Sequence, residues 1–420
     1  MLRILLVSWI LTGLIACGEP GTETQKDSSA KSDTLHTAVQ DITLPPPYAT
    51  ESVRNMSKPI GWPAGKTPQA PAGFTVTVFA DSLDSPRWIY VADDGSIYVA
   101  EANREKEKSA DRVSLFKDNN HDGIPESRSV FLQGLNQPFG MYKKGNKFYV
   151  ANTDAVMEYD VQPGVTTVSS PGKKIISLPA GPRHWTRNII ANADGSKLYI
   201  AVGSGSNVAE DGFAKEKGRA SIWEINPDGS GERIFASGLR NPVGMDWEPS
   251  THVLWTAVNE RDELGDELVP DYITAVKENG FYGWPFSYFG QHADPRLEDS
   301  AGSAEAMAKA LMPDYAVGAH TASLGLVFYK GNFPSKYMGG AFIGQHGSWN
   351  RSGFAGYKIV FVPFANGKPS GPMEDFLTGF IADESKKEVY GRPVGVAVMK
   401  DGSLLVADDG GNKIWRISKQ

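Results

Sequence analysis

One pattern recurs six times along this 420-residue chain and restricts what the chain can fold into. Each copy has a polar residue before a proline or small residue, then an apolar alternating strand, a turn such as DDG or KDG, and a second strand. The copies lie at residues 84–102, 136–153, 184–203, 240–259, 321–347 and 391–409. Strand pairs that return every ~40–50 residues are typical of the four-stranded blades of a β-propeller.

The distances between the copies predict six blades, with insertions between the later ones. From Pro86 in the first copy to Pro393 in the last, the intervals are 52, 48, 56, 81 and 70 residues. The last copy supplies three strands, whereas residues 74–80 (FTVTVFA) form a strand without a blade of its own. Pairing this strand with the last blade would close the ring and cover an open sheet edge. We therefore predict an all-β fold, a six-bladed β-propeller over residues 72–420.

The first 17 residues resemble a bacterial lipoprotein signal. Arg3 precedes an apolar run over residues 4–15, which is too short for a membrane span. The sequence LIAC at 14–17 matches the lipoprotein box, in which Cys17, the single cysteine of the chain, would carry the lipid. The alternative is a free, buried cysteine in an N-terminal helix.

These features predict a domain order and a location. We expect a signal peptide over 1–17 and a flexible periplasmic tether over 18–71, because the residues after Cys17 are polar, poor in aromatics and end in prolines. A lipid on the first mature residue anchors a chain without spanning the membrane. The chain should leave the cytoplasm by the Sec pathway and face the periplasm from a bacterial membrane, which we interpret as the outer one.

Charge and motifs exclude several function classes. The net charge is −7 and there is no long basic block, which argues against a nucleic-acid partner. No G-x-G-x-x-G or Walker pattern supports nicotinamide or ATP chemistry.

The phase of the repeat predicts a site. Residues just before the innermost strand of each blade meet around the mouth of a propeller, and here they form one polar, mostly cationic set: Asp84/Ser85, Asn136/Gln137, His184/Trp185, Arg240/Asn241, Thr321/Ala322 and Gly391/Arg392. Such a set suits a small anionic or polyhydroxylated ligand. Alternatively, these residues cap strands and pair with local acids.

His184 is the candidate base of this set, although a packing histidine at a strand end is the alternative. A neutral imidazole can accept a proton near neutral pH. Neighbouring arginines would lower its pKa and keep it unprotonated.

Six motifs in phase with the repeat resemble those of a known family. They are RHWTRN, GLRNPVG, VNERDELGDELVPDY, GFYGWPFSYFG, GQHGSWNRS and YGRPVGVAV, and the resemblance covers residues 72–418. Together they resemble the bacterial sorbosone dehydrogenase group, which is related to soluble quinoprotein glucose dehydrogenase and to fungal quinone-dependent pyranose dehydrogenases. The resemblance implies a propeller that holds pyrroloquinoline quinone (PQQ) beside a calcium ion and oxidises a sugar or sugar aldehyde.

The resemblance also implies residue roles. His184 matches the base, Arg240 and Asn241 match the pair at the reactive quinone carbonyls, and Arg392 matches an arginine for a cofactor carboxylate. On the substrate side it implies Gln137 and Trp185. The main-chain carbonyls of Arg261 and Asp262 match the calcium ligands, since calcium prefers oxygen donors. Cofactor contacts are also assigned to Trp349, Arg351 and Lys358, and Trp349 is as readily explained as a core residue.

One departure concerns the substrate. The glucose-oxidising branch carries an acid before its histidine, whereas Arg183 stands here, which argues against glucose. The electron acceptor implied by the resemblance is a membrane quinone or a cytochrome.

A second calcium site is one interpretation of DNNHDGIPE at 118–126. Asp118, Asn120 and Asp122 have the spacing of a calcium loop with Gly123 at its turn, but position twelve is Ser129 and not glutamate. The alternative is an Asx-rich β-turn.

Two other function classes stay open. A lactonase-type propeller hydrolase would need three or four metal ligands at the axis, where this sequence places more arginine than acid. A non-catalytic binding propeller is the second alternative.

Overall fold

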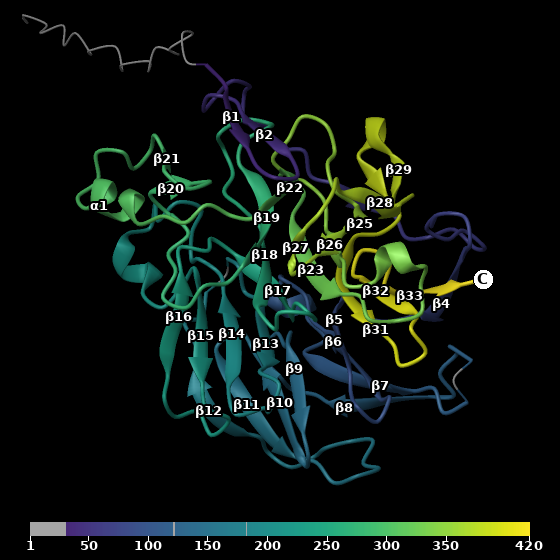
Figure 1. Cartoon of the computed structure of the whole chain (residues 1–420). Coiled ribbons are helices and arrows are strands. Elements are labelled where there is room, and N and C mark those ends of the chain that lie inside the picture. The colour runs from purple at the N-terminus through teal and green to yellow at the C-terminus, as the bar shows by residue number, and fades with distance from the viewer. Residues whose placement is uncertain (1–30, 121, 182) are drawn as a thin grey trace, which may run out of the picture. The chain divides into compact units, whose positions relative to one another are not determined.

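Six four-stranded antiparallel sheets, the blades, make up most of the strands (Figure 1). The structure is a computed structural model that describes residues 31–120, 122–181 and 183–420. Residues 32–420 form one unit. The predicted six-bladed β-propeller is confirmed.

The blades are numbered 1 to 6 in the order in which their innermost strands occur along the chain, and the innermost strand of each blade is given first. Blade 1 is β5 (Pro86–Val91), β6 (Ile97–Glu101), β7 (Arg112–Lys117) and β8 (Ser127–Leu132); blade 2 is β9 (Met141–Lys144), β10 (Lys147–Ala151), β11 (Ala155–Asp160) and β12 (Lys173–Ser177); blade 3 is β13 (Arg187–Ala191), β14 (Leu198–Val202), β15 (Ser221–Ile225) and β16 (Arg233–Ser237).

The second half of the ring continues in the same order. Blade 4 is β17 (Pro242–Trp247), β18 (Leu254–Val258), β19 (Pro270–Ala275) and β22 (Tyr315–Ala319); blade 5 is β23 (Ser323–Phe328), β24 (Ala341–Gln345), β25 (Lys358–Val362) and β28 (Glu374–Leu377); blade 6 is β31 (Pro393–Val398), β32 (Leu404–Asp408), β33 (Lys413–Lys419) and β4 (Phe74–Ala80).

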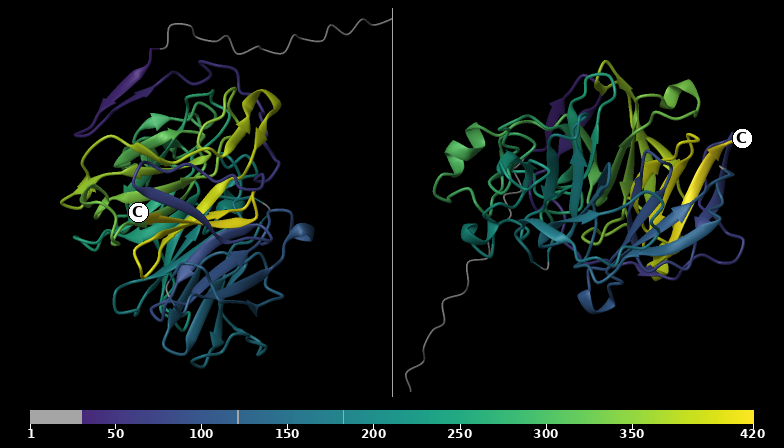
Figure 2. Two further views of the ribbon diagram at one scale, coloured as in Figure 1. Left: turned by 90° about the vertical axis from the view of Figure 1, so that its right-hand side faces the viewer. Right: turned by 90° about the horizontal axis from the view of Figure 1, so that it is seen from below.

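The ring is closed by a strand from the start of the propeller. β4 pairs antiparallel with β33, for example Thr77 opposite Arg416, so the first strand completes the last blade as predicted. Figure 2 shows β4 beside the yellow C-terminal strands. This pairing removes the edge that β33 would otherwise expose.

Short elements occupy the insertions. Between β19 and β22 lie β20 (Ser287–Tyr288), β21 (His292–Ala293) and the helix α1 (Ser303–Ala308), and blade 5 carries β26 (Phe364–Ala365) and β27 (Lys368–Pro369). Before blade 6 come β29 (Ile381–Asp383) and β30 (Glu388–Val389). The described residues also form four 3-10 turns: η1 (Lys106–Lys108), η2 (Phe213–Glu216), η3 (Ser335–Tyr337) and η4 (Glu384–Lys386). Within the described residues, no helix is both long and apolar enough to cross a membrane.

Glycines on the innermost strands let neighbouring blades approach closely. A Cβ on Gly244 of β17 would lie 2.5 Å from the backbone nitrogen of Leu326 in β23. A Cβ on Gly395 of β31 would lie 2.7 Å from the backbone oxygen of Arg87 in β5. The repeated PVG sequence therefore reflects backbone packing around the axis.

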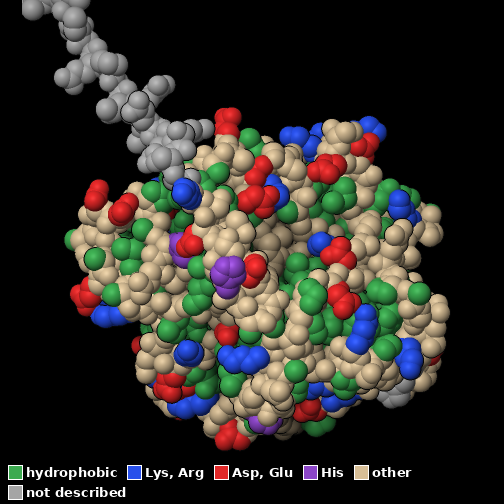
Figure 3. Space-filling view, turned by 45° about the horizontal axis from the view of Figure 1, so that its top comes forward, with side chains coloured by type: hydrophobic (Ala, Val, Ile, Leu, Met, Phe, Trp, Pro, Cys, Tyr) green, Lys and Arg blue, Asp and Glu red, His purple; other side chains and the backbone are tan. Residues whose placement is uncertain are grey.

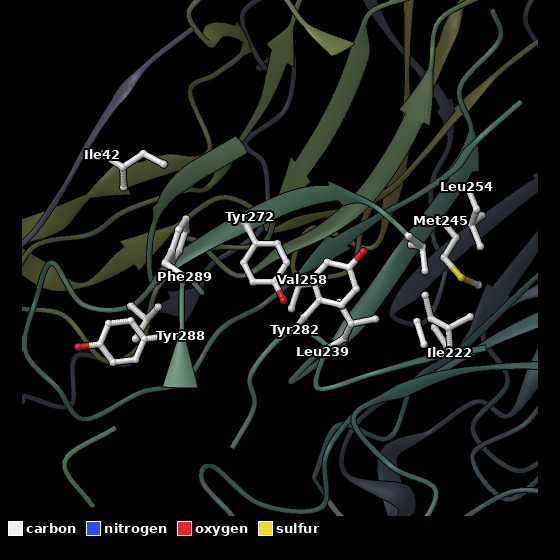
Figure 4. Packing of buried hydrophobic residues seen from close by; sticks show 14 of the residues in the cluster. Ile42, Ile222, Leu239, Met245, Leu254, Val258, Tyr272, Tyr282, Tyr288 and Phe289 are labelled. Atoms are coloured by element: carbon white, nitrogen blue, oxygen red, sulfur yellow. The ribbon is translucent and has the colours of Figure 1, made fainter. Parts of the chain in front are cut away.

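Residues 32–71 differ from the predicted flexible tether. β1 (Asp33–His36) pairs with β2 (Asp41–Leu44), and β3 (Lys58–Pro59) pairs in parallel with β30. Ile42 and Leu44 are buried in a cluster that includes Tyr272 and Phe289 (Figure 4). A few apolar residues in a polar segment thus suffice to hold it on the propeller. Residues 1–30, with the expected signal peptide and Cys17, lie outside the described residues.

Candidate active site

The residues at the start of the innermost strands are fixed by acids from the same blade or from the preceding one. Asp408 accepts the backbone N–H of Arg392 at 2.7 Å, and Asp271 accepts that of Ser323 at 2.8 Å. Burial raises the pKa of both carboxyls to about 6, although several N–H donors oppose the change. These acids therefore hold the backbone of the mouth in place, which favours the capping interpretation at these two positions.

His184 is held as a neutral imidazole with one nitrogen available. It has φ +44° and is half-buried. Its Nδ1 lies 2.9 Å from both the carbonyl oxygen and the Oγ of Ser204, and that Oγ donates its own proton to the carbonyl of Ser206 at 2.7 Å. Nδ1 must therefore carry the proton, which leaves the lone pair on Nε2.

The pKa of His184 lies well below its ordinary value. Burial is the largest cause and the charge of Arg240 is the next, while the hydrogen bond to Ser204 and the charge of Asp262 act in the opposite direction. The imidazole is consequently unprotonated at neutral pH. This is the state that a general base requires.

Asn241 lies beside His184 across a single glycine. A Cβ on Gly203 would lie 2.2 Å from Oδ1 of Asn241 and 2.6 Å from Cβ of His184. The Oδ1 atom is buried without a hydrogen-bond partner in the described part of the chain. A buried amide oxygen left without a donor is uncommon in folded proteins, so this atom can accept a hydrogen bond from a ligand in the mouth.

Arg240 is buried and fully hydrogen-bonded. It donates to the side chain and carbonyl of Asn207 (2.9 and 3.3 Å), to the carbonyls of Asn259 (3.3 Å) and Glu260, and to Asp262 Oδ2 (2.9 Å). All five of its N–H groups are used in this way. The predicted contact with a quinone carbonyl would require some of these bonds to be replaced. In the structure Arg240 acts on the site through its charge.

A second cluster joins blades 1, 5 and 6. Asp409 accepts from Arg87 and lies 2.9 Å from Nε2 of His346, while Arg392 donates to the carbonyls of His346 and Gly347 at 3.1 Å each. Burial and the charge of Arg392 lower the pKa of His346 to about 4, against the effect of Asp409. With His346 neutral, two guanidinium groups face one carboxylate. The excess positive charge suits an anionic group, as predicted for Arg392.

The predicted substrate residues have other partners. Gln137 is buried, and its amide donates to the carbonyls of Asn103 (2.8 Å) and Arg104 (3.2 Å) in blade 1. Trp185 is buried, with the guanidinium of Arg87 5.4 Å from its ring centre. Trp185 thus links His184 to the second cluster.

Three predicted cofactor residues lie farther along blade 5. Arg351 donates to the carbonyl of Asp266 (2.7 Å) and pairs with Glu267, and Lys358 pairs with Asp375 at 2.6 Å. Both line a cavity of about 490 Å³ over blade 5 that none of His184, Arg240, Asn241 and Arg392 lines. Trp349 is half-buried under Arg54, 5.4 Å from its ring centre, and its carbonyl accepts from Asn55 at 2.7 Å. The N-terminal segment therefore covers the loop that carries these residues.

The two predicted calcium ligands, the carbonyls of Arg261 and Asp262, lie in a densely hydrogen-bonded loop. The carbonyl of Asp262 accepts hydrogen bonds from Asn207 Nδ2 and from Arg296, each at 3.0 Å, so both of its lone pairs are used. The Arg261 side chain is fully buried among Glu260, Asp294 and the carbonyls of Pro285 and Ser287. Within the described ranges, no group of three or more histidine, cysteine or acidic side chains is placed to hold a metal.

Arg183 turns away from the base. Its exposed guanidinium pairs with Glu210, which also accepts the backbone N–H of Asn207 (3.0 Å) and Val208 (2.7 Å). The positive charge of Arg183, which stands where the glucose-oxidising branch has an acid, is thus neutralised by Glu210 of a neighbouring loop.

Sequence reasoning missed Arg87, Ser204, His346 and Asp409. Arg87 directly follows Pro86, one residue beyond the position that was compared across the repeat, and His346 lies within the quoted motif GQHGSWNRS. Extending the compared positions from Ser85 to Arg87, and likewise in the other copies, would have found Arg87.

On the face shown in Figure 3, acidic and basic side chains are interspersed.

Comparison with known proteins identifies the chain's relatives. Residues 68–279 and 287–420 match the model of a protein family described as TrAA12-like. An uncharacterized protein of Borreliella burgdorferi is 30% identical over 367 residues, which cover 84% of this chain and 90% of that protein. The pyrroloquinoline quinone-dependent pyranose dehydrogenase of Coprinopsis cinerea is 24% identical over 405 residues, which cover 83% of this chain and 54% of that protein. The chain thus spans about half the length of this second relative.

A solved structure supports the fold. The holo form of the pyranose dehydrogenase PQQ domain from Coprinopsis cinerea superimposes with a TM-score of 0.72 at 21% identity, covering 87% of this chain and 100% of that domain. At this identity the match supports the propeller fold alone.

Proposed function

Because the chain belongs to the TrAA12-like family, we propose that it is an oxidoreductase that oxidises a sugar or sugar aldehyde with pyrroloquinoline quinone as its bound electron acceptor. The substrate would be of the sorbosone, aldose or pyranose type. The observation that carries the proposal is the neutral His184, whose Nδ1 is fixed by Ser204 and whose Nε2 has no partner among the described residues, beside Asn241 Oδ1, which also has none there.

The residues of the mouth fit a carboxylated quinone. Oδ1 of Asn241 is available to a hydrogen-bond donor of the ligand, and Arg392 with Arg87 supplies more positive charge than Asp409 balances. When bound, the quinone supplies a two-electron acceptor for the hydride of the substrate carbon, and calcium would polarise it as a Lewis acid. Of the two predicted calcium ligands, the carbonyl of Arg261 is the one we retain.

The chain's own residues handle the proton. Nε2 of His184 accepts the hydroxyl proton of the substrate as the C–H bond breaks, so the proton rests on the imidazole and the electron pair leaves with the hydride. Ser204 keeps the ring in the required tautomer through Nδ1. Arg240 and burial keep the ring unprotonated beforehand, and Asp262, held by Arg240 at 2.9 Å, offsets part of the positive charge formed on it.

Replacing the base tests the proposal. His184→Ala should lower turnover of an aldose by about 10²–10⁴-fold, measured with an artificial dye after reconstitution with quinone and calcium. Quinone binding, followed by its absorption spectrum, should persist. His252→Ala, in an exposed turn, is the matched control and should leave both unchanged.

Two results would contradict the proposal. If the unmodified chain does not change the quinone spectrum, it is not a quinoprotein. If quinone binds but the His184 variant turns over as fast as the parent, the base lies elsewhere.

We also propose that the chain is exported and anchored through a lipid on Cys17, facing the periplasm. The motive is the LIAC sequence after a short apolar run. An anchored propeller could pass electrons to a membrane quinone or a cytochrome.

A further inference from the structure

A tryptophan of the N-terminal segment reaches the acid that holds Arg392. β3 pairs with β30, and the N–H of Ile60 then donates to the carbonyl of Val389 at 2.8 Å. Two residues further on, the indole Nε1 of Trp62 donates to Asp408 Oδ2 at 2.7 Å. Asp408 ends β32 of blade 6, so this bond joins residues 346 positions apart in the chain. The segment before the propeller therefore takes part in the hydrogen bonding of the mouth.

Asp408 is a fully buried carboxylate that accepts N–H groups at both of its oxygens. Oδ1 accepts the backbone N–H groups of Arg392 (2.7 Å) and Gly411 (2.8 Å). Oδ2 accepts the indole N–H groups of Trp62 (2.7 Å) and Trp415 (3.1 Å). A buried carboxylate is costly unless donors surround it. Without Trp62, Oδ2 would keep the longer bond, the one from Trp415.

Other aromatic rings fix the direction of the indole. The centre of the Trp62 ring lies close to three other ring centres: Trp415 at 5.0 Å, Tyr390 at 5.2 Å and Phe380 at 5.3 Å. Two of these contacts, with Trp415 and Phe380, are edge-to-face, an arrangement that aromatic pairs prefer. A Cβ on Gly411 would lie 2.7 Å from the indole, so the loop after β32 lies directly against it. The N–H of Trp62 is thus aimed at Asp408 by packing on several sides.

Asp408 connects Trp62 to the charged cluster around Arg392. The N–H of the next residue, Asp409, donates to the carbonyl of Arg392 at 3.2 Å, so the two chain segments are bonded in both directions. The carboxylate of Asp409 in turn lies 2.9 Å from Nε2 of His346. A shift of Asp408 would therefore displace Arg392 and Asp409 together.

We propose that Trp62 is a positioning residue of the quinone site: by donating its N–H to Asp408, it fixes Arg392 and Asp409 where the anionic group of the cofactor binds. This role rests on the proposed function, in which Arg392 faces a carboxylate of the quinone. The proton transfer takes place at His184 of blade 3 and does not involve Trp62. Loss of the indole N–H should therefore weaken quinone binding and leave the chemical step almost unchanged.

Trp62→Phe removes the N–H and keeps an aromatic ring, so its quinone affinity tests this role. The full chain is titrated with quinone in the presence of calcium, and the absorption spectrum of the quinone is followed. The dissociation constant of the variant should be about tenfold higher than that of the parent, because a hydrogen bond to a charged group is lost. Turnover of an aldose at saturating quinone should fall by less than about threefold.

Trp247→Phe is the matched control. Trp247 is half-buried at the far end of β17, and its Nε1 donates to the carbonyl of Ala191 at 2.7 Å. This variant also loses an indole hydrogen bond, but away from the mouth. It should bind quinone as the parent does.

The pH dependence separates this role from a general loss of packing. Burial raises the pKa of Asp408 to about 6, and the N–H groups of Trp415 and Trp62 act in the opposite direction. Without the N–H of Trp62 this pKa rises further, so Asp408 takes up a proton at a higher pH and releases Arg392. The ratio of the dissociation constants of variant and parent should therefore be larger near pH 6 than near pH 8. The other charged or titratable groups around Asp408 and Trp62 are the same in both proteins: Lys66, Arg87, His346, Arg392, Asp409 and Lys413.

A second variant replaces the first if Trp62→Phe does not fold. Benzothienylalanine at position 62, a tryptophan analogue with sulfur in place of the indole N–H, removes the hydrogen bond and keeps the size of the ring. Equal quinone affinity of parent and variant, or a ratio of affinities that does not change with pH, overturns the proposal. A parent chain that binds no quinone overturns it together with the proposed function. If the parent binds quinone and turns over, and the variant binds quinone equally well, only this role of Trp62 is overturned.

Discussion

Acidification should destabilise this propeller through one buried histidine, His346. Its Nε2 lies 2.9 Å from Asp409 Oδ1, and its side chain is 12% exposed. Burial and the charge of Arg392 lower its pKa to about 4, while Asp409 acts in the opposite direction. We predict that His346→Gln removes a large part of the loss of stability between pH 7.5 and 4.5.

The sign and size follow from proton binding. The ordinary pKa of histidine is about 6.5, so between that value and about 4 the unfolded chain binds a proton at this position and the folded chain does not. The stabilisation is fully present above pH 6.5 and is lost as the pH falls toward 4. A difference of about 2.5 pKa units corresponds to about 3 kcal/mol in total, of which about 2.5 kcal/mol is lost by pH 4.5.

Urea unfolding, followed by tryptophan fluorescence, measures this effect on the quinone-free chain. The free energy of unfolding of parent and variant should be compared at several pH values between 7.5 and 4.5. His184 also has a lowered pKa, but it is present in both proteins and cancels in the difference. Asp409 has a pKa lowered well below this range, despite its burial, by His346 and Arg87, so it stays ionised throughout.

The difference between parent and variant should therefore change by about 2.5 kcal/mol across this range, with the parent losing more. Parallel pH curves for the two proteins would refute the reasoning, because they would mean that His346 titrates alike in the folded and unfolded chains. A parent that gains stability on acidification would reverse its sign.

Two more predictions concern the mouth and the N-terminus. Gly203→Ala should lower turnover at least ~10-fold, because the added Cβ would displace Asn241 and His184, and should lower the free energy of unfolding by about 1–3 kcal/mol. The control is Gly353→Ala, whose Cβ would lie 3.5 Å from Glu384. A Gly203→Ala variant that keeps its activity would place the chemistry elsewhere. Cys17→Ser should abolish incorporation of labelled palmitate and release the chain from membranes; label retained in this variant would exclude the lipid anchor.

The blades were predictable because each one is local in sequence. Most blade strands pair with the next strand along the chain, so alternation and turns are enough to identify them. β22 and β28 pair across insertions, and the pairing of β4 with β33, which joins the two ends of the propeller, was inferred from a missing strand. The phase of the repeat then placed His184 with Arg240 and Asn241, since equivalent positions in successive blades meet at the axis.

The availability of hydrogen-bonding groups was not predictable in this way. The five donors of Arg240 are all bound by residues 207 and 259–262, and the carbonyl of Asp262 is already shared by Asn207 and Arg296. Both facts depend on loops whose conformation no periodic pattern specifies. The same holds for Ser204, which fixes the tautomer of His184.

The sequence alone determined the number of blades, the closure of the ring and the face on which the polar residues gather, because these depend on a periodic alternation of apolar residues. The tertiary structure decided which of those residues have free donors or lone pairs, and it placed residues 32–71 against the propeller through Ile42 and Leu44. The reason is physical: burial and hydrogen bonding are properties of contacts between distant segments, and two apolar side chains in a polar segment have no periodicity that would reveal their partners.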